Sequence, residues 1–337
     1  MKAVICTGSY PIEDSRALED TTLPDPVAQG RDLLVRVHAI SVNPVDTKMR
    51  RRFEPGSPAK VLGWDAAGVV EATGPDCTLF RPGDEVYYAG SIIRPGTNSE
   101  LHLVDERIVG RKPRNLSFAE AAAVPLTTIT AWEMLFERLQ VPRGDAGQGR
   151  ALLLIGGGGG VGSMAIQLAR QLTGLRIVAT ASRPDTRQWC LSLGAHDVID
   201  HHGDIPAQMA ALGVAQVGLI FSTTHTDKHW PAIAAVVAPS GRIGLIDDSG
   251  PFDISAIKGK SASLHWESMF THSLFGTADM QAQHDLLNET AGMLESGAVQ
   301  TTLADHYGPV NAANLRRAHA LIESGRARGK IVLEGFG

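Results

Sequence analysis

The sequence predicts an α/β protein with two parts, a doubly wound parallel sheet and a β-rich part. From about residue 126 to 270, short apolar runs alternate with segments of helical pattern, which indicates parallel strands joined by helices on both faces of a sheet. Residues 1 to about 120 are instead rich in proline, glycine and β-branched runs, typical of short strands and tight turns. A run of five glycines, Gly156 to Gly160, marks the first strand-to-helix turn of the alternating part.

The β-rich part begins with a short strand-like segment at the N-terminus. Further strands are expected at residues 33–40, 67–72 and 84–88, because β-branched and aromatic residues gather there between turn residues. The sequence Arg-Pro-Gly-Asp at residues 81–84 forms the turn before the last of these strands. His38 lies within the first of them, and we interpret it as a structural histidine.

The alternating part supplies six strands and the helices between them. Strands are expected at residues 151–155, 176–180, 197–200, 217–221, 241–246 and 263–268. Helices are expected at residues 163–172, 186–193 and 230–237. The last part of the chain is predicted to form helices at about 280–295 and 312–324 and a closing strand at 330–334.

The turn after the first of these strands carries the pattern Gly157-x-Gly159-x-x-Gly162, with Gly160 and Val161 inside it. Glycine is needed there for the tight turn, for close approach of a pyrophosphate and for close packing of the helix on the strand. The first N–H groups of the following helix point at the turn and attract phosphate. In its strand–turn–helix context the pattern predicts a dinucleotide site. A P-loop is disfavoured because no Gly-Lys-Ser/Thr sequence closes the run.

The residues after the second strand indicate which dinucleotide binds. A free ribose 2′-hydroxyl usually meets Asp or Glu at this point. Ser182 and Arg183 stand there instead, with Arg187 one turn further, and no carboxylate occurs before Asp185. Arginine can donate a fork of hydrogen bonds to a 2′-phosphate, so the sequence favours NADP(H) over NAD(H) and argues against S-adenosylmethionine. Further residues expected to line the cofactor follow the third, fourth and fifth strands: His201, Ser222, Thr223 and Asp247.

Composition and charge exclude several kinds of partner. The net charge of −5 gives no reason to expect nucleic acid or an anionic membrane surface as a partner. No stretch of about 18 apolar residues is present, so no membrane span is expected. The three cysteines are widely spaced, which is typical of reduced thiols in a cytoplasmic protein. A small-molecule substrate is therefore the expected partner.

Several stretches outside the glycine run also carry a pattern. They are Ser41–Asp46 (SVNPVD), Leu62–Val70 (LGWDAAGVV), Arg81–Val86 (RPGDEV), Pro125–Trp132 (PLTTITAW) and Gly329–Leu333 (GKIVL). Together with the glycine run they span nearly the whole chain and resemble the medium-chain dehydrogenase/reductase superfamily. Within it, the Asn43-Pro44 pair resembles the quinone oxidoreductase branch, and the subgroup often labelled zinc-type alcohol dehydrogenase-like is the most similar.

The resemblance implies a division into two domains. A GroES-like catalytic domain is expected at residues 1–125 and 271–337. A Rossmann NADP(H)-binding domain is expected at residues 126–270. Members of the superfamily commonly pair through the edge of the cofactor-domain sheet, so the resemblance also implies a homodimer.

The residues that would bind zinc in the zinc-dependent members are replaced here. Asn43 stands where a Cys ligand is expected, Trp64 where a His ligand is expected, and Pro125-Leu126-Thr127 where a further Cys usually occurs. A catalytic zinc needs about three protein ligands and an open position. Asp65 alone does not supply these, and the structural zinc lobe of the family needs four closely spaced cysteines. We therefore expect no metal. His225 and His229 have i,i+4 spacing, but no third ligand accompanies them in the sequence.

Loss of zinc removes the Lewis acid that alcohol oxidation uses. The resemblance therefore implies an NADPH-dependent reductase of quinones or α,β-unsaturated carbonyls, which accept hydride more easily. It places Asn43 and Thr127 near the nicotinamide and Lys330 near the cofactor phosphates. Lys48, Asp65 or a water are the candidates for proton donor. Two alternatives stay open: a zinc-dependent alcohol dehydrogenase, and an NADPH-binding structural or sensing protein with little turnover.

Overall fold

The computed structural model describes residues 1–54 and 56–337, and the chain divides into two compact units. Unit 1 comprises Met1–Ile129 and Phe270–Gly337, and unit 2 comprises Thr130–Met269. The first break falls inside helix α3 (Pro125–Trp132), four residues after the boundary expected from the sequence. Among the residues that the structure describes, no helix is long and apolar enough to cross a membrane.

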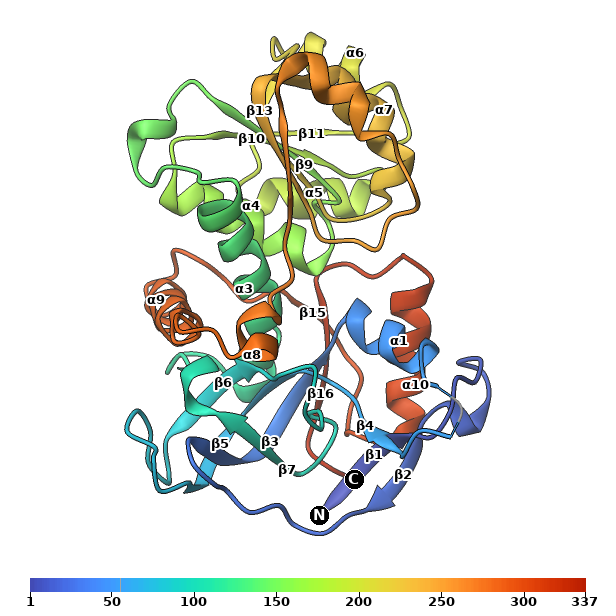
Figure 1. The fold of residues 1–337 in the computed structure, drawn as a ribbon, viewed down its shortest axis with the longest axis vertical. Coiled ribbons are helices and arrows are strands. Elements are labelled where there is room, and N and C mark those ends of the chain that lie inside the picture. Colours follow the sequence, from blue (N-terminus) through green and yellow to red (C-terminus); the bar gives the residue numbers. More distant parts are fainter. Residues whose placement is uncertain (55) are drawn as a thin grey trace. The chain divides into compact units, whose positions relative to one another are not determined.

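Unit 1 is built on a seven-stranded sheet whose strand order is β15-β16-β3-β5-β6-β8, with β7 also paired to β3. Its strands are β3 (Asp32–Val42), β5 (Asp65–Thr73), β6 (Glu85–Ala89), β7 (Leu101–Asp105), β8 (Val109–Arg111), β15 (Leu303–His306) and β16 (Lys330–Glu334). A second, three-stranded sheet contains β1 (Lys2–Cys6), β2 (Glu19–Thr22) and β4 (Lys60–Val61). The helices of this unit are α1 (Pro44–Arg51), α2 (Phe118–Ala122), α8 (Thr271–Phe275), α9 (Ala282–Glu295) and α10 (Ala312–Glu323). Figure 1 labels α1, α8, α9 and α10.

The register of three neighbouring strands in unit 1 decides where its polar residues meet. β16 runs antiparallel to β3, with Ile331 opposite Val42, and β3 runs antiparallel to β5, with Ser41 opposite Asp65. The first residue of β16 and the first residue of β5 therefore both lie beside the end of β3. Lys330 is that first residue of β16, although it is separated from β5 by more than 250 residues of sequence.

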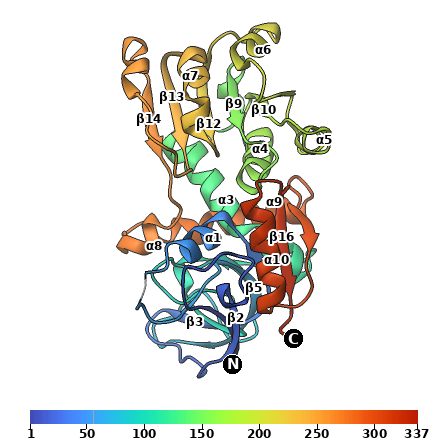
Figure 2. The ribbon, with the colours of Figure 1, turned by 90° about the vertical axis from the view of Figure 1, so that its right-hand side faces the viewer.

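Unit 2 is a six-stranded parallel sheet in the order β11-β10-β9-β12-β13-β14 (Figure 2). Its strands are β9 (Ala151–Ile155), β10 (Arg176–Thr180), β11 (Asp197–Ile199), β12 (Val217–Ser222), β13 (Val237–Leu245) and β14 (Ser263–Trp266). The connecting helices are α4 (Gly160–Leu172), α5 (Pro184–Ser192), α6 (Ile205–Ala211) and α7 (Thr226–Val236). This order, in which β9 leads to β10 and β11 on one side and β12 continues on the other, confirms the predicted doubly wound sheet.

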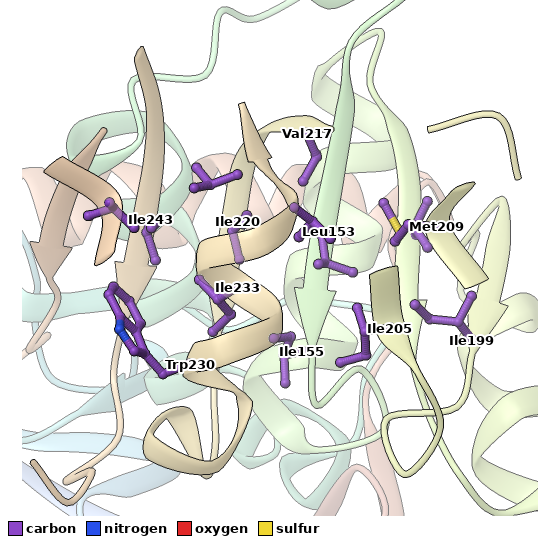
Figure 3. Close-up of a cluster of buried hydrophobic side chains, with 14 of the residues drawn as sticks. Leu153, Ile155, Ile199, Ile205, Met209, Val217, Ile220, Trp230, Ile233 and Ile243 are labelled. Atoms are coloured by element: carbon purple, nitrogen blue, oxygen red, sulfur yellow. The ribbon is translucent and has the colours of Figure 1, made fainter. Parts of the chain in front are cut away.

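A buried apolar cluster holds α6 and α7 against the sheet of unit 2 (Figure 3). Leu153, Ile155, Ile220 and Ile243 come from the strands, and all four are fully buried. The cluster is completed by side chains of the two helices: Ile205 and Met209 from α6, Trp230 and Ile233 from α7. Strands with near-continuous apolar runs are expected in a parallel sheet, because helices cover both of its faces.

Helix α7 begins four residues earlier than the sequence predicts. The backbone N–H of Thr226 donates to Oδ2 of Asp247 at 2.9 Å, and the Thr226 hydroxyl donates to Oδ1 at 2.6 Å. Asp247 follows β13 and thus caps a helix that precedes it by 21 residues. Local pattern could not show this start, because the capping carboxylate comes from another element.

Candidate functional site

The glycine run in unit 2 forms the turn from β9 into α4, and different constraints require glycine at its different positions. Gly156 has a φ of +86°, a conformation that favours glycine. A Cβ on Gly157 would lie 2.9 Å from Cβ of Ala179, and a Cβ on Gly162 would lie 2.3 Å from the carbonyl oxygen of Gly156. Gly157 and Gly162 are therefore required by close packing of the turn on the sheet and helix.

Gly159 differs from the other glycines of the pattern. Its φ of −78° is open to any residue, and the nearest atom to an added Cβ is 3.7 Å away. The protein itself does not require glycine here. Gly159 is the N-cap of α4, and Gly160, Val161 and Gly162 open the helix, so their N–H groups have no partner within it. The space beside Gly159 thus fits a phosphate group held at a helix N-terminus.

The loop after β10 places Ser182, Arg183 and Arg187 at the carboxyl end of the sheet. Ser182 and Arg183 are half-buried, and Arg183 is the N-cap of α5. Its guanidinium Nε lies 3.4 Å from Oδ1 of Asp185, the first carboxylate after the strand. Arg187 donates to the carbonyl oxygen of Ala181 at 3.5 Å. The segment from Ser182 to Arg187 thus carries two guanidinium groups and one hydroxyl, which are donors that suit a 2′-phosphate.

Three residues expected to line the cofactor, Ser222, Thr223 and Asp247, have hydrogen-bond partners within unit 2. Ser222 is fully buried, and its hydroxyl lies 2.8 Å from that of Thr226. Both carboxylate oxygens of Asp247 accept hydrogen bonds from Thr226, as described above. The hydroxyl of Thr223 donates to the carbonyl oxygen of Ile155 at 2.9 Å and lies against Gly156. The polar atoms of Ser222, Thr223 and Asp247 thus have partners at the strand ends and at the start of α7. The cofactor contacts expected of them stay predictions.

His201 lies in the loop after β11 among other histidines. Its ring centroid is 4.5 Å from that of His202 and 5.9 Å from that of His229. Its Nδ1 is buried and has no hydrogen-bond partner. Burial lowers the pKa of His201 below its ordinary value, and the neighbouring imidazoles lower it further. The His225–His229 pair noted in the sequence therefore belongs to a larger group of imidazoles.

In unit 1, Asn43, Asp65 and Lys330 form a buried polar cluster. Oδ2 of Asp65 accepts from Nδ2 of Asn43 at 2.7 Å and from Nζ of Lys330 at 3.0 Å. Oδ1 of Asp65 accepts from the backbone N–H of Leu126 at 2.8 Å. The Lys330 ammonium also donates to the Val42 carbonyl at 3.1 Å and to Oδ1 of Asn43. None of these three side chains is more than 3% exposed.

This arrangement bears on two predictions. The Lys330 ammonium, predicted near the cofactor phosphates, has three partners inside unit 1 and is almost completely buried. Its contact with the phosphates stays a prediction. Asp65 was a candidate proton donor, but both of its oxygens accept hydrogen bonds from N–H groups. Donor groups thus occupy both oxygens of Asp65 in unit 1.

The buried cluster does not fit a catalytic zinc. An amide and an indole, those of Asn43 and Trp64, stand where a Cys and a His ligand would be expected. Nε1 of Trp64 donates to the carbonyl oxygen of Ser91 at 3.1 Å. The Asp65 carboxylate already binds the Lys330 ammonium. Zinc prefers thiolate and imidazole ligands, and an ammonium beside the carboxylate would repel a divalent cation.

Asp46 is a residue of this cluster that sequence reasoning missed. It lies on α1, three residues after Asn43, and its Oδ2 accepts from the Asn43 backbone N–H at 2.9 Å. Its Oδ1 is buried without a partner, and burial raises the pKa of Asp46 to about 7. The Asn-Pro-x-Asp spacing is a helix-start signal that would have identified it, since an acidic residue at this position reaches back to the N-cap.

The remaining catalytic candidates lie on α1 and α3. Lys48 is half-buried on α1. Thr127 is only 2% exposed, and its hydroxyl donates to the carbonyl oxygen of Val124 at 3.1 Å. Thr127 directly follows Leu126, whose backbone N–H donates to Asp65. The resemblance, rather than any contact in unit 1, is the basis for placing Asn43 and Thr127 near a nicotinamide.

Comparison with known proteins agrees with both units. A family model described as "Alcohol dehydrogenase GroES-like domain" matches residues 29–132, and one described as "Zinc-binding dehydrogenase" matches residues 193–333. A zinc-type alcohol dehydrogenase-like protein of Staphylococcus aureus (strain MSSA476) is 38% identical over 335 residues, 99% of both chains. The chain belongs to the medium-chain dehydrogenase/reductase superfamily. Its α/β fold and GroES-like domain are those expected from the sequence.

Two solved structures of superfamily members extend the comparison. A candidate zinc-dependent alcohol dehydrogenase from Rhizobium etli CFN 42 is 58% identical, with a TM-score of 0.97 over 100% of this chain and 98% of that one. A quinone oxidoreductase from Pseudomonas syringae pv. Tomato DC3000 is 25% identical, with a TM-score of 0.83 over 99% of each chain. As a member of this superfamily, the chain shown in Figure 1 is an NAD(P)-dependent oxidoreductase.

Proposed function

We propose that this oxidoreductase is a zinc-independent, NADPH-dependent reductase of quinones or α,β-unsaturated carbonyls. The observation that carries the proposal is the Asn43–Asp65–Lys330 cluster, in which an ammonium rather than a metal neutralises the buried carboxylate. A quinone or an enone needs no Lewis acid, because charge that develops on reduction is delocalised onto its oxygen. The similarity to a quinone oxidoreductase supports the same reaction class.

The residues of the chain have separable tasks in this reaction. NADPH supplies the hydride when it is bound. The α4 N-terminus beside Gly159 binds its pyrophosphate, and Ser182 with Arg183 binds its 2′-phosphate. Asp65 fixes the Asn43 amide and the Leu126 backbone, so the start of α1 and the start of α3 keep one geometry. Because donor groups occupy both oxygens of Asp65, Lys48 or a water is the proposed proton donor.

An NADPH-oxidation screen tests the reaction and the metal together. We expect turnover with quinones or enones, little with simple ketones and alcohols, and rates unchanged by a chelator or by added zinc. The physical reason is that the buried cluster has no thiolate or imidazole to hold zinc. The screen measures absorbance of NADPH with each acceptor, and metal content is measured on protein purified without an affinity tag. One bound zinc per chain and loss of activity with the chelator would establish the alcohol dehydrogenase alternative.

Removal of Arg183 tests the choice of cofactor. We expect the wild-type protein to bind NADPH at least about tenfold more tightly than NADH, since a charged hydrogen bond contributes about 1.5–3 kcal/mol. Arg183→Ala should remove most of this preference and leave NADH affinity nearly unchanged. Fluorescence titration with each nucleotide measures both values. Arg81→Ala, an exposed arginine of unit 1, removes the same charge and should change neither. Equal weakening of both nucleotides in Arg183→Ala would show that Arg183 does not read the 2′-phosphate.

One observation keeps a second function in view. Because both oxygens of Asp65 accept hydrogen bonds, the site has few groups that can give a proton. A protein of this kind could bind NADPH and act as a structural or sensing component with little turnover. Tight NADPH binding together with no turnover across the whole screen would favour this second function over the reductase.

A further inference from the structure

Unit 2 contains a group of four histidines that the glycine turn and the Arg183 loop do not use. We call His201, His202, His225 and His229 the imidazole cluster. His201 and His229 are half-buried, and His202 and His225 are exposed. Tilted and edge-on ring contacts join His201 to His202 and to His229. The cluster thus presents several ring nitrogens in one place, among them the partnerless Nδ1 of His201.

The imidazole cluster lies at the carboxyl ends of the strands, where ligands of such sheets bind. His201 follows β11, while His225 and His229 follow β12, yet two strands, β10 and β9, separate β11 from β12 in the sheet. His201, in the loop after β11, and His229, in α7, nevertheless approach to 5.9 Å between ring centroids. The helices that follow these two strands, α6 and α7, contribute to one buried cluster. The glycine turn follows β9, so the cluster and the turn share one edge of the sheet.

The cluster also neighbours the loop expected to hold the 2′-phosphate. Thr180 of β10 pairs with Ile199 of β11, and the N–H of Ala181 donates to the carbonyl oxygen of Ile199 at 3.0 Å. Arg183 lies three residues after Thr180, and His201 lies two residues after Ile199. The loop after β10 therefore carries guanidinium and hydroxyl groups, and the adjacent loop after β11 carries imidazoles.

The charges that face the imidazole cluster are mixed. The neighbouring histidines lower the pKa of His201, whereas the Asp200 carboxylate raises it. Asp227 and Asp247 likewise raise the pKa of His229, and its neighbouring histidines lower it. Asp247 also accepts a hydrogen bond from Thr226 at the start of α7. Burial, followed by the neighbouring imidazoles, lowers the pKa of His201 and of His229. A dianionic phosphate nearby would reverse that balance, because it stabilises the imidazolium form.

We propose that the imidazole cluster is a pH-dependent part of the site for the adenosine 2′-phosphate, with His201 and His229 as its specificity-determining residues. This rests on the proposed NADPH specificity. As pH falls, the cluster gains positive charge next to the phosphate, and binding of the phosphate draws a proton onto an imidazole. Preference for the phosphorylated cofactor therefore increases toward mildly acidic pH and decreases toward alkaline pH.

The test uses adenosine 2′,5′-bisphosphate as the probe and adenosine 5′-monophosphate as the matched ligand without the 2′-phosphate. Calorimetry at about pH 8, 7 and 6, with a chelator in every sample, compares wild-type protein with the His201→Asn/His229→Asn variant. The ratio of wild-type to variant affinity cancels the titration of the phosphate itself. We expect this ratio for the bisphosphate to rise about three- to tenfold from pH 8 to pH 6 and to stay flat for the monophosphate.

Repeating the titrations at about pH 6.5 in buffers of different ionisation heat counts the protons. The wild-type protein should take up a fraction of a proton with the bisphosphate, and the variant should take up less. His306→Asn, an exposed histidine of unit 1, serves as the control and should behave as wild type. A flat ratio with normal bisphosphate binding would overturn the role of the cluster. No preference for the bisphosphate over the monophosphate at any pH would overturn the proposed NADPH specificity itself.

Discussion

Gly159→Val should abolish NADPH binding, with a loss of roughly 100-fold or more, while the chain folds as before. The backbone at Gly159 has a φ of −78° and a ψ of 174°, which a valine adopts without strain. An added Cβ meets no protein atom closer than 3.7 Å. The two methyl groups would instead fill the space at the N-terminus of α4, where the pyrophosphate must approach the backbone. Fluorescence titration with NADPH measures the loss, and urea unfolding measures the stability.

The matched control is Gly162→Ala, which adds a single carbon to the third glycine of the same pattern. Its Cβ would lie 2.3 Å from the carbonyl oxygen of Gly156, so the turn and α4 must move apart. This variant should lose stability in urea, whereas Gly159→Val should not. Two variants with equal stability and equal NADPH affinity would contradict the separate roles of these glycines.

Lys330→Met should produce the largest loss of stability, about 3–5 kcal/mol in the free energy of unfolding, because it leaves the buried Asp65 carboxylate without a counter-charge. Asp65 is completely buried, and two N–H donors would remain to it from Asn43 and Leu126. Urea unfolding at several pH values measures the effect. Lys228→Met, which removes an exposed lysine of unit 2, should cost less than about 0.5 kcal/mol.

A second substitution separates the two possible causes of this loss. Adding Asp65→Asn to Lys330→Met should recover much of the stability, because no buried charge then remains unpaired. A loss that persists in the double variant would show that packing of the lysine stem, not its charge, is responsible.

The sequence alone determined the features that rest on local spacing. The spacing of Gly157, Gly159 and Gly162 after an apolar run predicts a strand-to-helix turn, because the pattern lies within one short segment. The alternation of apolar runs with helical segments specified the parallel sheet for the same reason. Replacement of the expected metal ligands at Asn43 and Trp64 could likewise be seen in the sequence, since it requires only the identity of a residue at a position.

Tertiary structure decided which polar groups are available and which are committed. Lys330 meets Asp65 because β16 and β5 both border β3, a pairing across 265 residues that no local pattern encodes. Asp247 caps α7, and His201 meets His229, because separate strand ends converge at one edge of a sheet. A side chain's chemistry is set by the partners that burial gives it. Residue type therefore identified the candidate residues. Only the fold showed that Asp65 and Lys330 form a buried ion pair, and that His201 contacts the rings of His202 and His229.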